Sequence, residues 1–232
     1  MPDSTYLTLA ADRSSTNGGR KILARPSIRP LTVILFLVLL VLPIAIPLRV
    51  LVLAGAALIW TFLEAGNLKP LGLGRRGLAS TLGWGVGVAI AVTVLGEAFA
   101  PLIERVLSMK SDYSGYGALA GNAGAAFRLL EFALTSAAIG EEVLFRGFLL
   151  HQLTGILGRG NRSRWVSIVT SGAIFGAAHM IQGPTGMLTT GIVGMVFAWA
   201  WFRSGRNLWA LMLAHAIVDS SGIAMLYFGR YA

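Results

Sequence analysis

Long apolar segments separated by short polar ones dominate the chain. Most are long enough for the roughly 20 residues that a helix needs to cross a bilayer. The first, 31–64, is too long for one simple span, and Pro43 and Pro47 interrupt it. We therefore expect a tight helical hairpin, about 31–46 and 48–64, with one long kinked helix as the alternative. The remaining spans are expected at about 78–100, 127–153, 165–182, 185–202 and 208–229.

This pattern predicts an all-α fold, a polytopic transmembrane helical bundle of about seven spanning helices over residues 31–229. Residues 1–30 are polar and basic, so we expect a disordered cytoplasmic tail there. Residues 104–126 are expected to form a polar loop. Nothing in the apolar region reads as a long linker, so one membrane domain follows the tail.

The composition supports a membrane class. Of the 232 residues, 55% are apolar and only 12% are charged, and the mean hydropathy is +0.71. A soluble domain has roughly a quarter of its residues charged. The net charge of +9 resides between the apolar runs, which favours anionic lipid headgroups over nucleic acid as partners. The absence of cysteine excludes disulfides, thiolate zinc sites and a cysteine nucleophile.

The distribution of Lys and Arg predicts the orientation in the membrane. With the N-terminus in the cytoplasm, the inside segments hold thirteen basic residues and the outside segments hold five. We therefore expect a cytoplasmic N-terminus, in the cell membrane of a bacterium. A single helix over 31–64 would invert the later alternation, so the charge bias also favours the hairpin.

Several ionisable residues fall inside the apolar runs, where each charge costs roughly 2.5–3.5 kcal/mol on insertion scales. Glu64, Glu97 and Glu131 lie near the ends of their spans, and we interpret them as interfacial. His151 also lies near an interface and receives no role. Three deeper clusters remain, and function is the default hypothesis for charges at that depth.

The first cluster contains Glu141, Glu142 and Arg146 in the fourth span. Glu142 and Arg146 are four residues apart, so they share a helix face and can form an ion pair. Glu141 points about 100° away and has no partner within the helix. A carboxylate without a partner in an apolar site suits a general base or acid. The alternative is that both glutamates neutralise arginines of neighbouring helices.

The other two clusters contain histidine. His179 follows Phe175 by four residues in the fifth span, and His215 precedes Asp219 by four residues in the seventh. A carboxylate on the same face as an imidazole can fix its tautomer. His179 alone has a plainer reading, a histidine bonded to a backbone carbonyl. Two of three histidines in apolar helices, beside two unexplained glutamates, favour one shared polar site.

Taken in order, Glu-Glu-x-x-x-Arg at 141–146, Phe-x-x-x-His at 175–179 and His-x-x-x-Asp at 215–219 resemble the three motifs of the CPBP family. These are the CAAX prenyl proteases and the bacteriocin-processing or immunity proteins, also called the Abi family. Asp219 stands where the family usually has Asn. The resemblance implies an intramembrane endopeptidase that acts on a membrane-anchored, lipidated or hydrophobic peptide.

The resemblance also implies roles for these residues. Glu141, with His179, would activate the attacking water, while His215 and Asp219 would stabilise the oxyanion. An ionised Asp219 would repel an oxyanion, so it must be protonated or orient His215. Glu142 and Arg146 would support the site. No metal or other cofactor is expected, although Glu141, His179 and His215 could in principle hold zinc.

Counting about 1.5 Å of rise per residue places Glu141 and His179 at similar depths, with His215 nearer the cytoplasmic surface. A shared site therefore requires a tilted seventh helix or shifted boundaries. Two other functions stay open: a non-catalytic membrane protein, for instance in bacteriocin immunity, and a small transporter with a carboxylate proton relay. The sequence leaves the physiological substrate and the oligomeric state open.

Overall fold

The computed structural model describes residues 22–42 and 45–230. The first 21 residues of the predicted tail, and Pro43 at the predicted hairpin turn, lie outside the described residues.

The described residues are almost entirely helical and contain no strand, which confirms the predicted all-α fold. The seven predicted spans correspond to seven helical segments. Their bounds are α2 Ile28–Leu40, α3 Ile46–Ala65, α4 Leu78–Leu107, the continuous run of α5 Ala123–Phe132, η3 Ala133–Leu149 and α6 Leu150–Leu157, then α7 Asn161–Ala178, α8 Gly183–Arg203 and α9 Leu208–Tyr227. In the described part of the chain, three short turns join these segments, η1 Lys69–Leu71, η2 Ser114–Tyr116 and η4 Met180–Gln182.

Five of these segments are long and apolar enough to cross a membrane by length and composition. They lie at Pro47–Ala65, Leu78–Leu107, Ala123–Leu157, Met180–Arg203 and Leu208–Tyr227. The apolar α2 is shorter. α7 begins with a polar first turn that includes Arg162 and Arg164, which lowers its mean hydropathy.

The first apolar run forms two helices, α2 and α3, which confirms the hairpin and rules out the single kinked helix. The predicted polar loop at 104–126 is too long at both ends. α4 continues past Pro101 to Leu107, because a proline disturbs the preceding turn without preventing the following residues from staying helical. At the other end, the Asn122 side chain accepts a hydrogen bond from the backbone N–H of Ala125 and caps α5.

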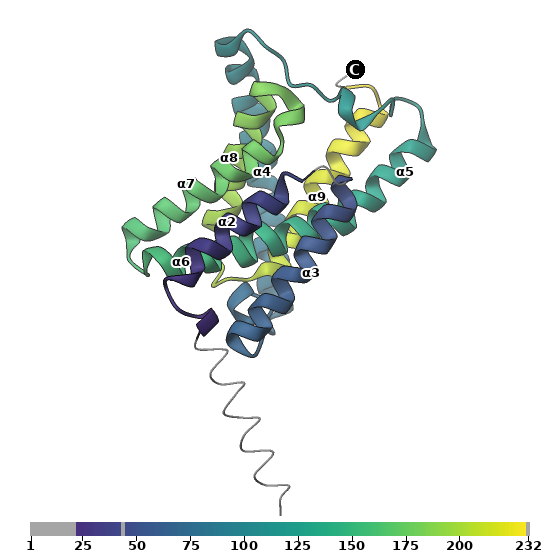
Figure 1. Ribbon diagram of the computed structural model, residues 1–232. Coiled ribbons are helices and arrows are strands. Elements are labelled where there is room, and N and C mark those ends of the chain that lie inside the picture. The colour runs from purple at the N-terminus through teal and green to yellow at the C-terminus, as the bar shows by residue number, and fades with distance from the viewer. Residues whose placement is uncertain (1–21, 43–44, 231–232) are drawn as a thin grey trace, which may run out of the picture.

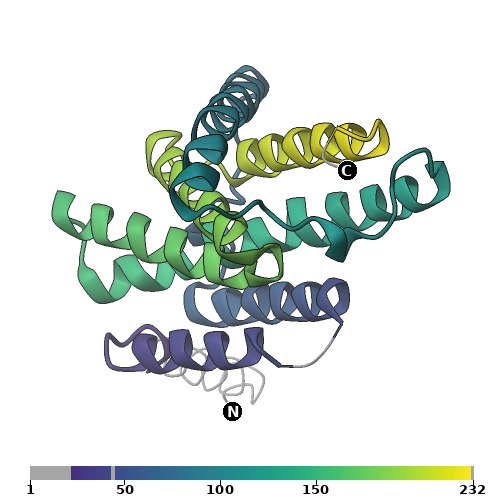
Figure 2. The same cartoon turned by 90° about the horizontal axis from the view of Figure 1, so that it is seen from above.

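The long α5–η3–α6 run forms the centre of the bundle. Figure 2 shows α2 and α3 as an outer layer along one side of it, with α9 and α4 on the other side. η3 packs against α3 and against α9, while α7 packs mainly against α8. The buried side chains of η3 are therefore surrounded by other helices, and any charge among them must find its partners inside the bundle.

Glycines allow α7 and α8 to approach closely. A Cβ on Gly172 would lie 2.8 Å from the carbonyl oxygen of Gly191, and a Cβ on Gly194 would lie 3.1 Å from the Cα of Gly172. A Cβ on Gly176 would overlap the carbonyl oxygen of Met187. Small residues at helix contacts are typical of membrane bundles, where packing drives association. This contact fixes the end of α7, where His179 follows.

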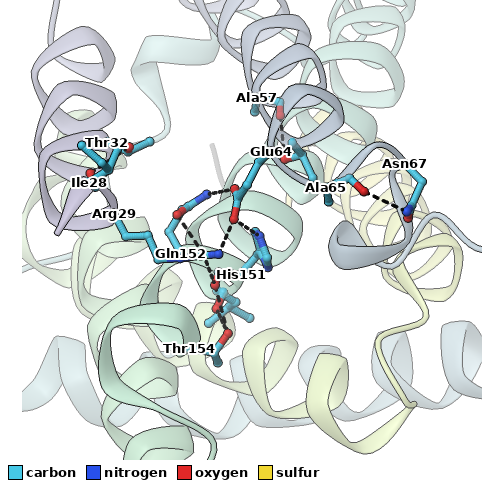
Figure 3. A network of polar contacts seen from close by, with 12 residues as sticks. Ile28, Arg29, Thr32, Ala57, Glu64, Ala65, Asn67, His151, Gln152 and Thr154 are labelled. Carbon is cyan, nitrogen blue, oxygen red and sulfur yellow. Dashed lines mark hydrogen bonds and ion pairs between the residues drawn. The ribbon is translucent and has the colours of Figure 1, made fainter. Parts of the chain in front are cut away.

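A polar network joins α2, α3 and α6 (Figure 3). The buried Glu64 pairs with Arg29, accepts a hydrogen bond from Nε2 of Gln152 at 3.0 Å, and lies 3.2 Å from Nε2 of His151. Arg29 also donates to Oε1 of Gln152 at 3.1 Å. Glu64 lies one residue before the end of α3, near the end of its span as predicted. The sequence did not show its partners, because they come from other helices.

Three basic connectors meet at one end of the bundle. Arg76 donates a hydrogen bond to the carbonyl oxygen of Gly205 at 2.6 Å, so the segments before α4 and before α9 lie together. Burial, followed by the positive charges of Arg159 and Arg164, lowers the pKa of Arg206. The segment between α6 and α7 therefore lies at this end too. A cytoplasmic N-terminus, as predicted, requires these three connectors to lie on the same side of the membrane.

The Glu64 network provides a stability test. Glu64→Leu leaves the buried Arg29 charge without its carboxylate, so the free energy of unfolding in detergent should fall by about 3–5 kcal/mol. The double variant Arg29→Met with Glu64→Leu removes both charges and should recover most of that loss. Thermal and denaturant unfolding measure both. A double variant no more stable than Glu64→Leu would contradict the ion-pair account.

The close contact between α7 and α8 provides a second test of stability. Gly176→Ala inserts a methyl group against the backbone of α8, and such overpacking costs about 1–3 kcal/mol of unfolding free energy. Gly87→Ala is the matched control, because nothing lies within 4 Å of a Cβ there. This control should be neutral or stabilising by up to about 1 kcal/mol, through helix propensity. Equal effects of the two substitutions on the melting temperature would refute the close-contact role.

Candidate active site

The glutamate motif lies on η3, a π-helical segment within the central run. Its backbone bonds span five residues rather than four, a geometry that is rare and often found at functional sites. Two glycines allow neighbours to approach this helix. A Cβ on Gly140 would lie 2.8 Å from Cγ1 of Val50, and one on Gly147 would lie 3.3 Å from Cβ of Leu71. η3 is thus held tightly against α3 and η1.

Glu142 is the centre of the polar cluster. Its side chain is fully buried, and Oε1 lies 2.9 Å from Nη1 of Arg146 and 2.8 Å from Nδ1 of His215. One carboxylate oxygen therefore binds a cation on its own helix and an imidazole on α9. The predicted Glu142–Arg146 pair is confirmed. The bond to His215 was missed, because no spacing within one helix reveals a partner 73 residues away.

Arg146 is held by aromatic rings as well as by charge. Its guanidinium carbon lies 4.0 Å from the centre of the Phe175 ring and 4.9 Å from that of Phe197. The side chain is only 1% exposed, and among the described residues its guanidinium nitrogens make no hydrogen bond of good geometry. The Glu142 carboxylate and the two ring faces therefore offset the cost of burying this charge.

His215 faces a carboxylate on each side. Nδ1 lies 2.8 Å from Glu142, and Nε2 lies 3.5 Å from Oδ2 of Asp219, the predicted partner one turn along α9. The longer contact is an ion-pair distance rather than a tight hydrogen bond. The depth difference expected from counting residues does not separate the motifs. α9 begins at Leu208 as predicted, and His215 still reaches Glu142.

His179 lies just beyond the end of α7, not inside a span as predicted. Its Nδ1 lies 2.8 Å from the carbonyl oxygen of Phe175, one of the last carbonyls of the helix. The plainer reading, a bond to the backbone, is therefore correct for Nδ1. With Nδ1–H as the donor, Nε2 keeps its lone pair. The Phe175 ring lies near both imidazoles, with its centre 4.6 Å from that of His179 and 6.4 Å from that of His215.

Glu141 differs from its neighbour in having no ion pair among the described residues. It is half-buried, and its Oε2 is buried with no hydrogen-bond partner in that part of the chain. The Phe175 ring lies against the imidazoles of both His179 and His215, and the guanidinium of Arg146 lies over its face. The three motifs therefore meet in one polar site on η3, α7 and α9, with one carboxylate paired and the other available.

The zinc alternative requires three converging donors. In the described part of the chain, no group of three or more His, Asp or Glu side chains is arranged to hold a metal ion. Nδ1 of His215 is bonded to Glu142, and Nε2 faces Asp219. A zinc ion on Glu141, His179 and His215 would have to displace one of those carboxylates, so the residues present do not fit this metal site.

Comparison with protein families gives a match over the part of the chain that holds the three motifs. Residues 124–221 match the family model described as type II CAAX prenyl endopeptidase Rce1-like. That segment contains every candidate residue described above. No curated protein and no solved structure gives a match. The family match confirms the resemblance to CAAX proteases. Together with the long apolar helices, it identifies an integral membrane protein of the protease class.

The two adjacent glutamates should respond differently to substitution. Glu142→Gln leaves Arg146 buried without a carboxylate, so the unfolding free energy should fall by about 3–5 kcal/mol. Glu141→Gln breaks no ion pair in the described structure, so its cost should stay below about 1 kcal/mol. The exposed Glu131→Gln is the control. Unfolding in detergent measures all three, and a Glu141→Gln variant as unstable as Glu142→Gln would refute the division between them.

Proposed function

We propose that this membrane protease is an intramembrane endopeptidase of the CAAX-protease type, which hydrolyses a peptide bond through a water activated by Glu141. The observation that carries the proposal is the contrast between the two glutamates. Through Oε1, Glu142 pairs with Arg146 and His215, whereas Glu141 forms no ion pair among the described residues; a buried Oε2 without a hydrogen-bond partner is common to both. An uncommitted carboxylate in a largely apolar site is suited to take a proton from water.

In the proposed reaction, the Glu141 carboxylate removes a proton from water while the water oxygen forms a bond to the scissile carbonyl carbon. His179, with Nε2 available, holds that water in position. The carbonyl oxygen becomes an oxyanion. When the C–N bond breaks, the proton returns from Glu141 to the leaving amine. The products are a carboxylic acid and an amine, and the glutamate is regenerated.

His215 and Asp219 act on the oxyanion side of this reaction. Glu142 fixes the imidazole through Nδ1, which directs Nε2 toward Asp219 and the space beside it. Between two carboxylates, His215 acts as the imidazolium, so Nε2 carries a proton as well as Nδ1. Because the Nε2–Asp219 contact is long, this second N–H can be shared with an oxyanion. Asp219 then acts by orienting His215 and does not contact the oxyanion itself. Its negative charge is therefore not placed directly against that of the oxyanion.

The substrate class follows from the location of the site. A site enclosed by apolar helices suits a peptide that reaches it from the bilayer, so we propose a membrane-anchored, lipidated or hydrophobic peptide. The basic end of the bundle faces anionic lipids on the cytoplasmic side in this proposal. No metal or other cofactor takes part.

Cleavage of a panel of lipidated and membrane-anchored peptides in liposomes tests the function. Glu141→Gln should lower kcat by about 10³-fold or more, because one group serves as both base and acid. The exposed Glu131→Gln should cleave at the native rate, and a chelator should not change it. Loss of cleavage on chelation, restored by zinc, would contradict the proposed mechanism. A folded native protein that cleaves nothing would favour immunity or binding.

A further inference from the structure

The loop between α4 and α5 is hydrogen-bonded to the turn between α7 and α8 and to the start of α8. The backbone N–H of Asp112 donates to the carbonyl oxygen of Gln182 at 3.0 Å. The Thr185 hydroxyl donates to the carbonyl oxygen of Met109 at 2.9 Å. Figure 1 shows this connection running from α4 toward the C-terminal end of α9. These bonds hold a loop segment beside the turn that follows His179.

Within this loop, Tyr116 is bonded to a buried amide. Nε2 of Gln182 donates to the Tyr116 hydroxyl oxygen at 2.5 Å. The other end of the amide accepts a hydrogen bond from the Thr190 hydroxyl at 3.0 Å, which fixes which atom is the donor. The absence of a Cβ at Gly186 makes room for the Gln182 side chain. The tyrosine oxygen is thus used as an acceptor, and its proton is left to donate elsewhere.

The same bond places Tyr116 beside the turn that follows His179. Gln182 belongs to η4, and its backbone N–H donates to the carbonyl oxygen of His179 at 3.0 Å, so one turn separates the two residues. Burial raises the pKa of Tyr116, and the negative charges of Asp219 and Glu141 raise it further. The hydroxyl therefore stays protonated at neutral pH.

A count of donors shows what this hydroxyl adds. Hydrolysis of an amide needs hydrogen-bond donors for the oxyanion. Nδ1 of His215 is bonded to Glu142, and Nδ1 of His179 to a backbone carbonyl. An ionised Asp219 accepts only. The guanidinium of Arg146 is covered by Phe175 and Phe197. Among the described side chains discussed for this site, and apart from the covered guanidinium of Arg146, Nε2 of His215 and the Tyr116 hydroxyl are the donors not fully committed.

We infer that Tyr116 is a further catalytic residue, whose hydroxyl, held by Gln182, donates a hydrogen bond to the oxygen of the scissile carbonyl as negative charge develops on it. The inference rests on the proposed endopeptidase function. Tyr116 and Nε2 of His215 form the two donors of one oxyanion site, contributed by the α4–α5 loop and by α9. The phenol keeps its proton throughout, so the reaction written above stays balanced.

Tyr116→Phe tests the inference, because it removes the hydroxyl and keeps the ring. Loss of one oxyanion donor lowers kcat by roughly 10²–10³-fold. We expect that loss with KM within about twofold and an unchanged melting temperature. Tyr113→Phe, in the same loop, is the matched control and should cleave at the native rate. A Tyr116→Phe variant that keeps the native kcat, or that changes only KM, would overturn the inference.

An isosteric replacement covers the case in which Tyr116→Phe disturbs the loop. Incorporation of trifluorotyrosine at position 116 makes the phenol more acidic, and its titration can be followed by absorbance. Below the measured pKa of this phenol, kcat should stay near native. Above it, but below the pKa of ordinary tyrosine, kcat should fall toward the level of Tyr116→Phe. Unchanged kcat across that titration would also overturn the inference.

These outcomes are separable from failure of the proposed function. If the native protein cleaves, Glu141→Gln is inactive and Tyr116→Phe is fully active, the endopeptidase stands and the role of Tyr116 falls. If the native protein is folded and cleaves nothing, both fall together.

Discussion

A buried carboxylate with no access to water must be neutralised inside the protein, and Glu142 meets this constraint through two partners. One oxygen binds Arg146 on the same helix and His215 on α9. Removing any one of the three would leave an uncompensated charge or polar group in an apolar interior. The relative position of η3 and α9, and with it the meeting of the first and third sequence motifs, depends on this bridge.

The bridge explains why two adjacent glutamates can have opposite properties. Oε1 of Glu142 holds two partners on two helices, while Glu141 forms no ion pair among the described residues. A second polar network, centred on Glu64, joins α2, α3 and α6 without contributing to the site. The fold therefore uses ion-paired carboxylates, Glu64 and Glu142, to hold helices together, while Glu141 stays outside those pairs.

The sequence predicted the helical class, the hairpin at 31–64 and the Glu142–Arg146 pair, because hydropathy and helical spacing are local properties. It missed the Glu142–His215 bond, the Arg29–Glu64 pair and the Tyr116–Gln182 bond. Each joins residues at least 35 positions apart and depends on which helices are neighbours. It also placed His179 within a span. The residue instead ends α7, where a side chain can reach back to a carbonyl that the helix leaves unbonded.

The most direct test of the account is a single-turnover cleavage in ¹⁸O-labelled water, followed by mass spectrometry of the product and of the protein. Activation of water by Glu141 predicts that the new carboxyl group of the product carries one ¹⁸O after the first turnover. The Glu141 side chain would carry none. An unlabelled product, with ¹⁸O in Glu141, would show that the glutamate attacks the peptide bond itself, and would contradict the account.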